Sequence, residues 1–340
     1  MPDRVLVTGI SGFVGGHVAL ALLGAGYVVR GSVRHPGKAA AVKAALGQAG
    51  ADTGRLEFVA LELGSDAGWA AAMTGVRYLQ HVASPLPGRL PADREEVIEP
   101  AVEGTRRALE AAFAAGVERV VLTSSMAALA YGHDPNRTEP FGQKDWTDLR
   151  GRPVNAYVES KTRAERKAWE IAERHGRSAG LVAVNPSVIL GPLLDRDPGT
   201  SVGLLVRLLG RGLPLAPALS LNIVDVRDVA ALQLAAMEVA DAGGQRYPAG
   251  QGPYSIKTLS AMMRTLFPER SRRLPRYEAP NWLVRLIGRF NSDLRSGVDE
   301  LGVVKRIDGA AAGALLGRPF LPVAETLQAT GRSLIARGLV

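Results

Sequence analysis

The chain has 340 residues, of which 46% are hydrophobic and 22% charged, a composition typical of a soluble globular protein rather than a disordered or fibrous one. It contains no cysteine, which excludes disulfides, thiolate zinc sites and a cysteine nucleophile, and which fits a cytoplasmic location. The formal charge of +8 is spread among alternating basic and acidic residues, so we predict no nucleic-acid partner. No segment resembles a membrane span or a secretory signal, and we expect no membrane partner.

The first half of the chain alternates short apolar runs with helical patterns. Val- and Leu-rich runs such as RVLVTGI, YVVRGSVR, LEFVALEL, YLQHVAS and VERVVLTSS are separated by segments of helical periodicity. This alternation predicts an α/β fold with a doubly wound parallel sheet, because parallel strands need long crossover connections. Beyond Gly250 the segments IKTLSAMMRTLF, NWLVRLIGRF and VAETLQATGRSLIARG predict amphipathic helices of a smaller part.

A glycine motif follows the first predicted strand. In VTGISGFVGG, the glycines Gly9, Gly12 and Gly15 lie between that strand and an apolar helix. Glycines at this place allow a tight turn and the close approach of a diphosphate, which the unpaired N–H groups of the helix N-terminus then bind. The motif predicts a Rossmann-type dinucleotide-binding domain over residues 1–185, rejoined by residues 220–242. Residues 186–340 are predicted to form a mostly helical substrate-binding part.

The end of the second predicted strand bears on the choice of dinucleotide. The segment YVVRGSVRHPGK contains no carboxylate and carries Arg34 and Lys38 at its end. A carboxylate here would bind the ribose 2′-hydroxyl of NAD, whereas a guanidinium can hold a 2′-phosphate with paired hydrogen bonds. The sequence therefore favours NADP(H). Glu62 and Leu63 end the third predicted strand, where contacts to adenine are expected.

Polar residues follow two further strands, and a tyrosine and a lysine lie on the next helix. Ser84 follows the fourth strand, residues 123–125 (Thr-Ser-Ser) end the fifth, and Tyr157 and Lys161 share one side of the helix in NAYVESKTRAE. Alone, the serines could be turn residues, and the Tyr–Lys pair could belong to an ordinary surface helix. After a dinucleotide motif, however, this order is what a reductase needs.

The combination resembles the extended short-chain dehydrogenase/reductase (SDR) family. It is most similar to the branch of dihydroflavonol reductases, cinnamoyl-CoA reductases and bacterial aldehyde reductases. The matching segments cover nearly the whole chain, in the order VTGISGFVGGHV, GSVRHPGK, HVASP, LTSS, DWTDL, AYVESKTRAE, NPSVILGP and NIVDVRDVA.

This resemblance implies an NADPH-dependent carbonyl reductase with Ser125, Tyr157 and Lys161 as its catalytic residues and Ser124 as the alternative serine. Tyr157 would protonate the carbonyl oxygen as NADPH delivers hydride to the carbon, Ser125 would donate a hydrogen bond to that oxygen, and Lys161 would hold the nicotinamide ribose. Because a free phenol has a pKa of about 10, Lys161 and the nicotinamide are expected to lower the pKa of Tyr157. Ala101 stands where the family often carries an asparagine for proton relay.

The resemblance also implies the remaining site residues. The cofactor is expected to contact Thr8, Gly9, Ser11, Gly12, Phe13, Val14, Gly15, Arg34, Lys38, Glu62, Leu63, Val82, Ala83, Ser84, Thr123, Tyr157, Lys161, Pro186 and Val188. The substrate is expected to contact Ser84, Pro85, Ser125, Met126, Ala127, Tyr157 and Asn222.

The expected partners are a small carbonyl substrate and, if any protein, a second copy, since the family has monomers and homodimers. The candidate lining segments SMAALA, NPSVIL and SPLPGRL are mostly small and apolar, which predicts a small to medium apolar or aromatic aldehyde or ketone. The histidine spacing predicts no metal site. Two alternatives use the same fold: an epimerase or dehydratase acting on a nucleotide sugar, and a non-catalytic NADP-sensing protein.

Overall fold

The computed structural model describes residues 2–85, 91–210, 213–290 and 297–340. At its centre lies a parallel seven-stranded sheet in the order β3-β2-β1-β4-β5-β6-β9. Its strands are β1 (Arg4–Thr8), β2 (Val28–Val33), β3 (Leu56–Ala60), β4 (Tyr78–His81), β5 (Arg119–Thr123), β6 (Leu181–Pro186) and β9 (Arg246–Ala249). The strand order reverses beside β1, which confirms the predicted doubly wound Rossmann-type sheet and creates the crevice where such sheets bind ligands.

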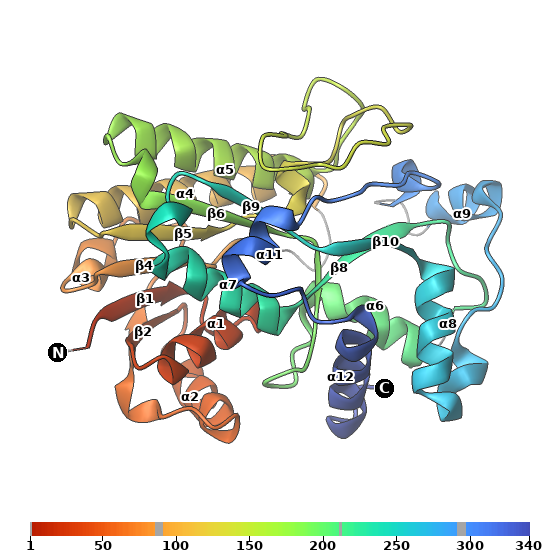
Figure 1. The fold of residues 1–340 in the computed structure, drawn as a ribbon, viewed down its shortest axis with the longest axis horizontal. Helices are drawn as coiled ribbons and strands as arrows, with labels where there is room; N and C mark the ends of the chain where they lie inside the picture. The colour runs from red at the N-terminus through yellow and green to blue at the C-terminus, as the bar shows by residue number, and fades with distance from the viewer. Residues whose placement is uncertain (1, 86–90, 211–212, 291–296) are drawn as a thin grey trace.

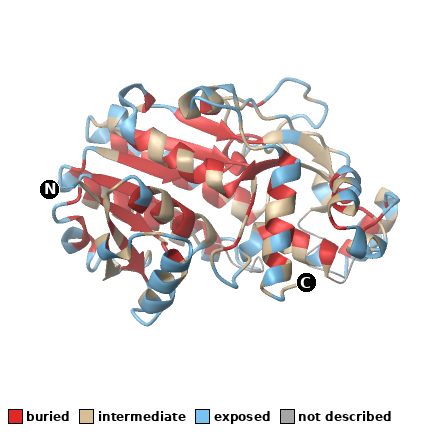
Figure 2. Ribbon diagram, turned by 60° about the horizontal axis from the view of Figure 1, so that its bottom comes forward, coloured by how far each residue is buried: buried red, intermediate tan, exposed pale blue. Residues whose placement is uncertain are grey.

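Helices cover both faces of this sheet (Figure 1). One layer contains α1 (Phe13–Gly24), α2 (Lys38–Gln48) and α7 (Val226–Glu238); the other contains α3 (Trp69–Met73), α4 (Glu95–Ala114) and α5 (Ala156–Arg174). Side chains along β1 alternate between the layers: Val5 and Val7 belong to the first core, and Leu6 belongs to the second. Figure 2 shows the strands buried between exposed outer helix faces, which is why the strand runs are almost wholly apolar.

A smaller lobe is built on a second sheet of order β10-β8-β7. Its strands are β7 (Val188–Leu190), β8 (Ser220–Asp225) and β10 (Gln251–Ser255). Its helices are α6 (Gly199–Leu209), α8 (Ile256–Leu266), α9 (Asn281–Gly288) and α12 (Val323–Ala336). The last three fall on the amphipathic segments predicted beyond Gly250. The apolar segment 181–190 is divided at Ser187, so that β6 belongs to the large sheet and β7 to the small one.

Residues 220–242 return to the large sheet only in part. Helix α7 packs against α1 as expected, but β8 pairs in the small sheet, and the seventh strand β9 lies beyond this segment. The prediction that the strand of this segment joins the large sheet was wrong, because β8 is apolar on both faces and suits either sheet. Val224 contributes to the core of the large sheet, and Ile223 contributes to the core of the small lobe. Helix α11 (Ala310–Leu316), from the part predicted to bind substrate, also packs on α7 and β9.

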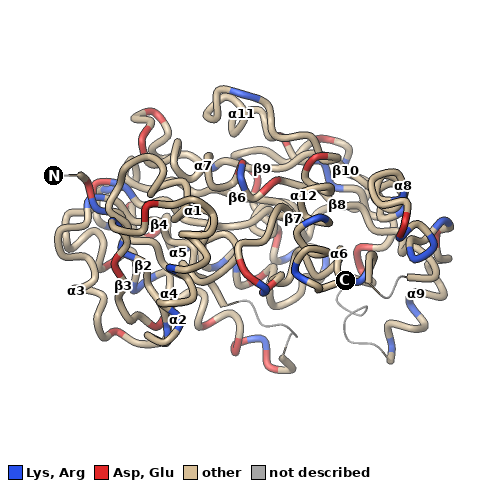
Figure 3. Tube along the Cα trace, turned by 90° about the horizontal axis from the view of Figure 1, so that it is seen from below, with Lys and Arg blue, Asp and Glu red and all other residues tan. Residues whose placement is uncertain are grey.

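Charged residues of both signs are interspersed along the trace in Figure 3 rather than separated onto different parts. Among the residues that the structure describes, no helix combines the length and apolarity needed to cross a bilayer.

Candidate active site

The glycine loop between β1 and α1 is closely packed, and two of its glycines cannot be replaced without a clash. A Cβ atom on Gly15 would lie 2.2 Å from the carbonyl oxygen of Gly9, and one on Gly9 would lie 3.0 Å from Cα of Ala83. Gly9 also has a φ of 69°, in the left-handed region that favours glycine. The amide of Gly12 donates to the carbonyl of Gly9 at 3.0 Å, which closes the turn.

The N-terminus of α1 fits a diphosphate. Gly12 is the N-cap and supplies no side-chain acceptor, and the first turn carries no acidic residue. The N–H groups of Phe13 and Val14 therefore have no side-chain cap at the positive end of the helix dipole. A pocket beside this turn is lined by Ser11, Gly12 and Phe13 on one side and by Val42 and Leu46 of α2 on the other, among other residues.

The predicted phosphate-binding residues lie just beyond β2. Arg34 follows the strand directly, Lys38 is the first residue of α2, and both are exposed. No acidic residue lies in β2 or in the turn up to Lys38, so no carboxylate of this segment opposes a 2′-phosphate. The two residues expected to contact adenine differ in exposure. Glu62 is exposed, whereas Leu63 is half-buried and its side chain contacts Gly104 of α4.

A hydrogen-bond cluster joins the ends of β1 and β4. The amides of Val82 and Ala83 both donate to Oγ1 of Thr8 at 3.0 Å, and Oγ1 also lies 3.0 Å from Nδ1 of His81. Since both acceptor positions of the hydroxyl are used, Thr8 donates its proton to His81, whose ring proton then sits on Nε2. Burial lowers the pKa of His81 to about 3, and the charge of Lys161 acts in the same direction, so the ring is neutral. His81, which sequence reasoning missed, thus fixes the loop that contacts Gly9.

The predicted catalytic residues converge on the carboxyl edge of the sheet. Ser125 is buried and caps the short 3-10 helix Met126–Ala128, where its Oγ accepts from the amide of Ala127 at 3.1 Å. Tyr157 and Lys161 lie on α5, which begins after Asn155, whose side chain accepts from the amide of Val158 at 2.9 Å. Nζ of Lys161 lies 3.4 Å from the carbonyl oxygen of Thr123 at the end of β5.

The pKa values of the tyrosine and the lysine are both governed by burial. Burial lowers the pKa of Lys161 to about 8, and the charge of Glu165 partly opposes this. Burial raises the pKa of Tyr157, and the neighbouring Ser125 side chain opposes it. The expected lowering of the Tyr157 pKa by Lys161 is therefore not found in the protein alone: the effect that opposes burial is the hydrogen bond of the Ser125 side chain, and burial outweighs it.

The two adjacent serines have different environments. Oγ of Ser124 donates to Oε2 of Glu165 at 2.5 Å inside the protein, whereas Ser125 is the serine whose side chain acts on Tyr157. The side chain of Thr123 accepts from Nε2 of Gln233, so it is occupied by a protein partner.

The other candidates lie at the same edge of the sheet. Ser84 and Pro85 follow β4 and are half-buried, Pro186 ends β6, and Val188 begins β7. Residues 86–90 of the predicted lining segment SPLPGRL lie outside the described residues. Met126 and Ala127 are buried within the short 3-10 helix. Asn222 is buried on β8 and donates from Nδ2 to the carbonyl of Lys305 at 2.8 Å.

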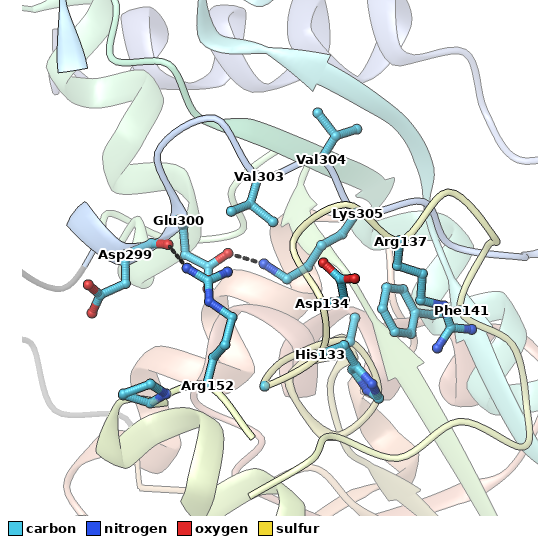
Figure 4. Close-up of a pocket in the computed structure, with 13 residues that line it drawn as sticks. His133, Asp134, Arg137, Phe141, Arg152, Asp299, Glu300, Val303, Val304 and Lys305 are labelled. Carbon is cyan, nitrogen blue, oxygen red and sulfur yellow. Dashed lines mark hydrogen bonds and ion pairs between the residues drawn. The ribbon is translucent and has the colours of Figure 1, made fainter. Parts of the chain in front are cut away.

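A pocket opens between the loop after β5 and the segment before α11 (Figure 4). Lys305 donates to the carboxylate of Glu300 there, and Arg152 donates to the backbone carbonyl of Asp299 at 3.2 Å. Nζ of Lys305 also lies 4.2 Å from the ring centroid of Tyr131. Burial raises the pKa of Tyr131, and the charge of Glu300 and the Tyr157 phenol act in the same direction. The predicted lining segment SMAALA contributes Ala130 to this pocket, whose lining also includes the charged residues Asp134 and Arg137.

Comparisons with known proteins place this geometry in a family. Residues 5–250 match the NAD dependent epimerase/dehydratase family. Tetraketide alpha-pyrone reductase 2 of Arabidopsis thaliana is 34% identical over 251 residues, which cover 72% of this chain and 76% of that protein. Ketoreductase azaE of Aspergillus niger is 31% identical over 312 residues, covering 86% of this chain and 90% of that protein.

The fold agrees with that of a solved reductase. The yeast methylglyoxal/isovaleraldehyde reductase Gre2, in its complex with NADPH, superposes with a TM-score of 0.82 at 26% identity, covering 99% of this chain and all of that one. The family match, the relatives and the doubly wound sheet together confirm the extended SDR resemblance. The chain therefore belongs to the NAD dependent epimerase/dehydratase family, and it is an oxidoreductase related to the family's reductases.

Proposed function

We propose that the protein is an NADPH-dependent carbonyl reductase that converts an aldehyde or ketone to the alcohol. The observation that carries the proposal is that Lys161 on α5 contacts the carbonyl at the end of β5, and that the Ser125 side chain just beyond β5 acts on Tyr157 of the same helix. An acid, a hydrogen-bond donor and a cation beside a dinucleotide site are the groups that carbonyl reduction requires.

The residues of the chain favour NADP(H) as the cofactor. The uncapped N-terminus of α1 suits the diphosphate, and Arg34 and Lys38 suit the 2′-phosphate in the absence of an acid on β2. The related Gre2 structure is a complex with NADPH. When bound, NADPH supplies the hydride that reduces the carbonyl carbon.

The protein groups supply the proton and stabilise the developing charge. Tyr157 is protonated at neutral pH, since an ordinary phenol has a pKa of about 10 and burial raises the pKa of Tyr157 further, and it gives its phenolic proton to the carbonyl oxygen. Ser125 donates a hydrogen bond to the same oxygen and stabilises the negative charge that develops there. Lys161, held near the carbonyl of Thr123, adds positive charge and contributes to holding the nicotinamide ribose.

The substrate is proposed to extend from Tyr157 toward Tyr131. Met126, Leu129 and Ala130 form a small apolar cluster with Phe141, and Tyr131 packs against it. The partly exposed ring of Tyr131 at the edge of this buried cluster suits an apolar or aromatic group next to the carbonyl. The charged pocket behind Tyr131 suits a polar end of the molecule.

A cofactor-oxidation screen tests the proposal. The purified protein is mixed with NADPH or NADH and with a panel of aliphatic and aromatic aldehydes, ketones and a 1,2-diketone, and oxidation of the cofactor is followed together with alcohol formation. A reductase consumes one NADPH for each alcohol formed. A nucleotide-sugar epimerase would return its cofactor unchanged, and a sensing protein would bind NADPH without turnover with any member of the panel.

A further inference from the structure

A fully buried carboxylate lies next to the predicted catalytic residues, and the mechanism proposed above does not use it. Glu165 is 0% exposed and is placed on α5 one turn after Lys161. Its Oε2 accepts from Oγ of Ser124 at 2.5 Å and from Nδ2 of Asn185 at 2.7 Å. Its Oε1 accepts from Nε of Arg246 at 2.5 Å and from Nε1 of Trp169 at 3.3 Å. A buried charge with this many partners is costly to assemble, so it is a candidate for a specific task.

Arg246 connects this carboxylate to the loop that follows the catalytic serine. Nη1 donates to the carbonyl of Gln143 at 3.1 Å and to that of Asp145, and Nη2 lies 3.5 Å from the carbonyl of Ala128. The guanidinium also stacks on the ring of Trp146, with Cζ 3.7 Å from the centroid. One arginine on β9 thus joins α5, the 3-10 helix after Ser125 and the loop before α5.

The partners of Glu165 fix the backbone that carries Ser125. Ser124 is held through its side chain by Glu165 and through its amide by the carbonyl of Val184 at 2.8 Å. Asn185, which donates to Glu165, also lies 3.4 Å through Nδ2 from the carbonyl oxygen of Ser125. The turn is therefore held from both sides, and its orientation depends on the carboxylate.

We propose that Glu165 is a positioning residue for the reaction, whose carboxylate, paired with Arg246, holds the Ser124–Ser125 turn and places a negative charge one turn from Lys161. This inference rests on the proposed carbonyl reduction. Among the described residues, the titratable groups that interact electrostatically with Lys161 are Glu165, one turn away on the same helix, and the neutral His81 on β4. Of these two, Glu165 is the group that opposes the lowering of the lysine pKa by burial.

The test compares Glu165→Gln with a matched control on the same helix. Glu170 is exposed and pairs with Lys167, so Glu170→Gln removes a carboxylate from α5 without touching the buried cluster. We expect Glu165→Gln to lower kcat roughly ten- to hundredfold, as small displacements of reacting groups do, while the KM for NADPH stays within about twofold. We also expect the alkaline limb of kcat/KM to move to lower pH, because Lys161 loses its stabilising charge. Glu170→Gln should match the wild type in each respect.

Two further variants separate positioning from stability. Replacing both members of the ion pair, with Glu165→Met and Arg246→Met, removes both buried charges and should recover much of the thermal stability lost by either single change. If Glu165 positions the turn, kcat stays low in this stable double variant. Arg246→Lys keeps the charge but loses the fork that contacts the loop carbonyls, and it should lower kcat without moving the alkaline limb. If Glu165→Gln does not fold, Arg246→Lys still tests whether the ion pair positions the serine turn.

A readout without turnover keeps this inference apart from the proposed function. The ionisation of Lys161, followed by NMR of isotope-labelled lysine in the full chain, should move to lower pH in Glu165→Gln even if no carbonyl compound is reduced. A wild type inactive with the whole panel would overturn the proposed function alone. Two outcomes would overturn the positioning role. One is a Glu165→Gln variant that has the kcat and the lysine titration of the wild type. The other is a double variant that recovers kcat together with its thermal stability.

Discussion

The ammonium nitrogen of Lys161 lies 3.4 Å from the carbonyl oxygen of Thr123, at the point where β5 ends and the serine turn begins. This contact links the helix that carries Tyr157 to the strand end that carries Ser125. The lysine is buried, so its charge acts within a medium of low dielectric constant and affects its neighbours more strongly than a surface lysine would.

Activity should fall at moderately alkaline pH because the pKa of Lys161 is lowered to about 8. If the charged lysine is required, kcat/KM declines above about pH 8 and not near the ordinary lysine value of about 10.4.

The stability of the protein should change in the opposite direction over the same pH range. Between about pH 8 and 10.4 the lysine is protonated in the unfolded chain but not in the folded protein, so the free energy of unfolding rises as the pH rises. Comparing kcat/KM and urea unfolding of the wild type and Lys161→Met across pH checks both signs. A wild-type profile flat to pH 10 would contradict the role of the lysine charge.

Tyr157→Phe should reduce kcat by roughly 10²- to 10⁴-fold, because it removes only the proton donor. The dissociation constant of NADPH, measured by fluorescence titration, should stay nearly unchanged, since the ring and its packing remain. Turnover at the wild-type rate would remove Tyr157 from the mechanism.

The two serines should respond differently to truncation. Ser125→Ala should lower kcat by about 10²- to 10³-fold, because a donor to the reacting oxygen is lost. Ser124→Ala leaves that donor in place and removes one hydrogen bond to the buried Glu165, so we expect a smaller loss of kcat and a lower melting temperature. Steady-state kinetics and thermal melts of both variants decide which serine acts on substrate; the reverse order of kcat would assign the role to Ser124.

Arg34→Asp should shift cofactor preference toward NADH. Losing a charge-assisted contact worth about 1.5–3 kcal/mol corresponds to a roughly ten- to hundredfold rise in the KM for NADPH, and the new carboxylate can accept from the ribose hydroxyl of NADH. Arg332→Asp is the control, because Arg332 is an exposed arginine on α12 of the smaller lobe. An unaltered preference ratio in Arg34→Asp would place the phosphate contact elsewhere, with Lys38 as the next position to test.

Gly15→Ala should weaken NADPH binding at least tenfold and lower the melting temperature, because the added Cβ would lie 2.2 Å from the carbonyl oxygen of Gly9. Gly24→Ala is the matched control on the same helix: nothing lies within 4 Å of its Cβ position, and the change should be neutral or should stabilise by roughly 0.5–1 kcal/mol. Calorimetric titration with NADPH and thermal melts measure both effects. Wild-type affinity in Gly15→Ala would show that the loop adapts to the extra atom.

Local patterns predicted the nucleotide half of the fold well, and the smaller lobe less well. The alternation of apolar strands and helices and the glycine motif were sufficient for the doubly wound sheet. The partner of a strand is a long-range choice, however, and β8 could have joined either sheet because Ile223 and Val224 on its opposite faces are both buried. The division of segment 181–190 at Ser187 likewise depends on which sheet each half joins.

For the site, spacing alone placed Tyr157 and Lys161 on one side of a helix. The strand ends left several polar residues as candidates, and only the family resemblance selected Ser125 among them. The sequence could not show that Glu165 is buried, since a glutamate in SKTRAERKAWE has the pattern of a solvated helix face, nor that its partner is an arginine 81 positions away in the chain. It also could not give the direction of the Tyr157 pKa shift. The identity of each residue and its spacing along the chain are local properties, and they determined which kinds of chemical group the site contains. Burial, pairing and the resulting shifts in proton affinity depend on which distant segments pack together, and only the tertiary structure decided them.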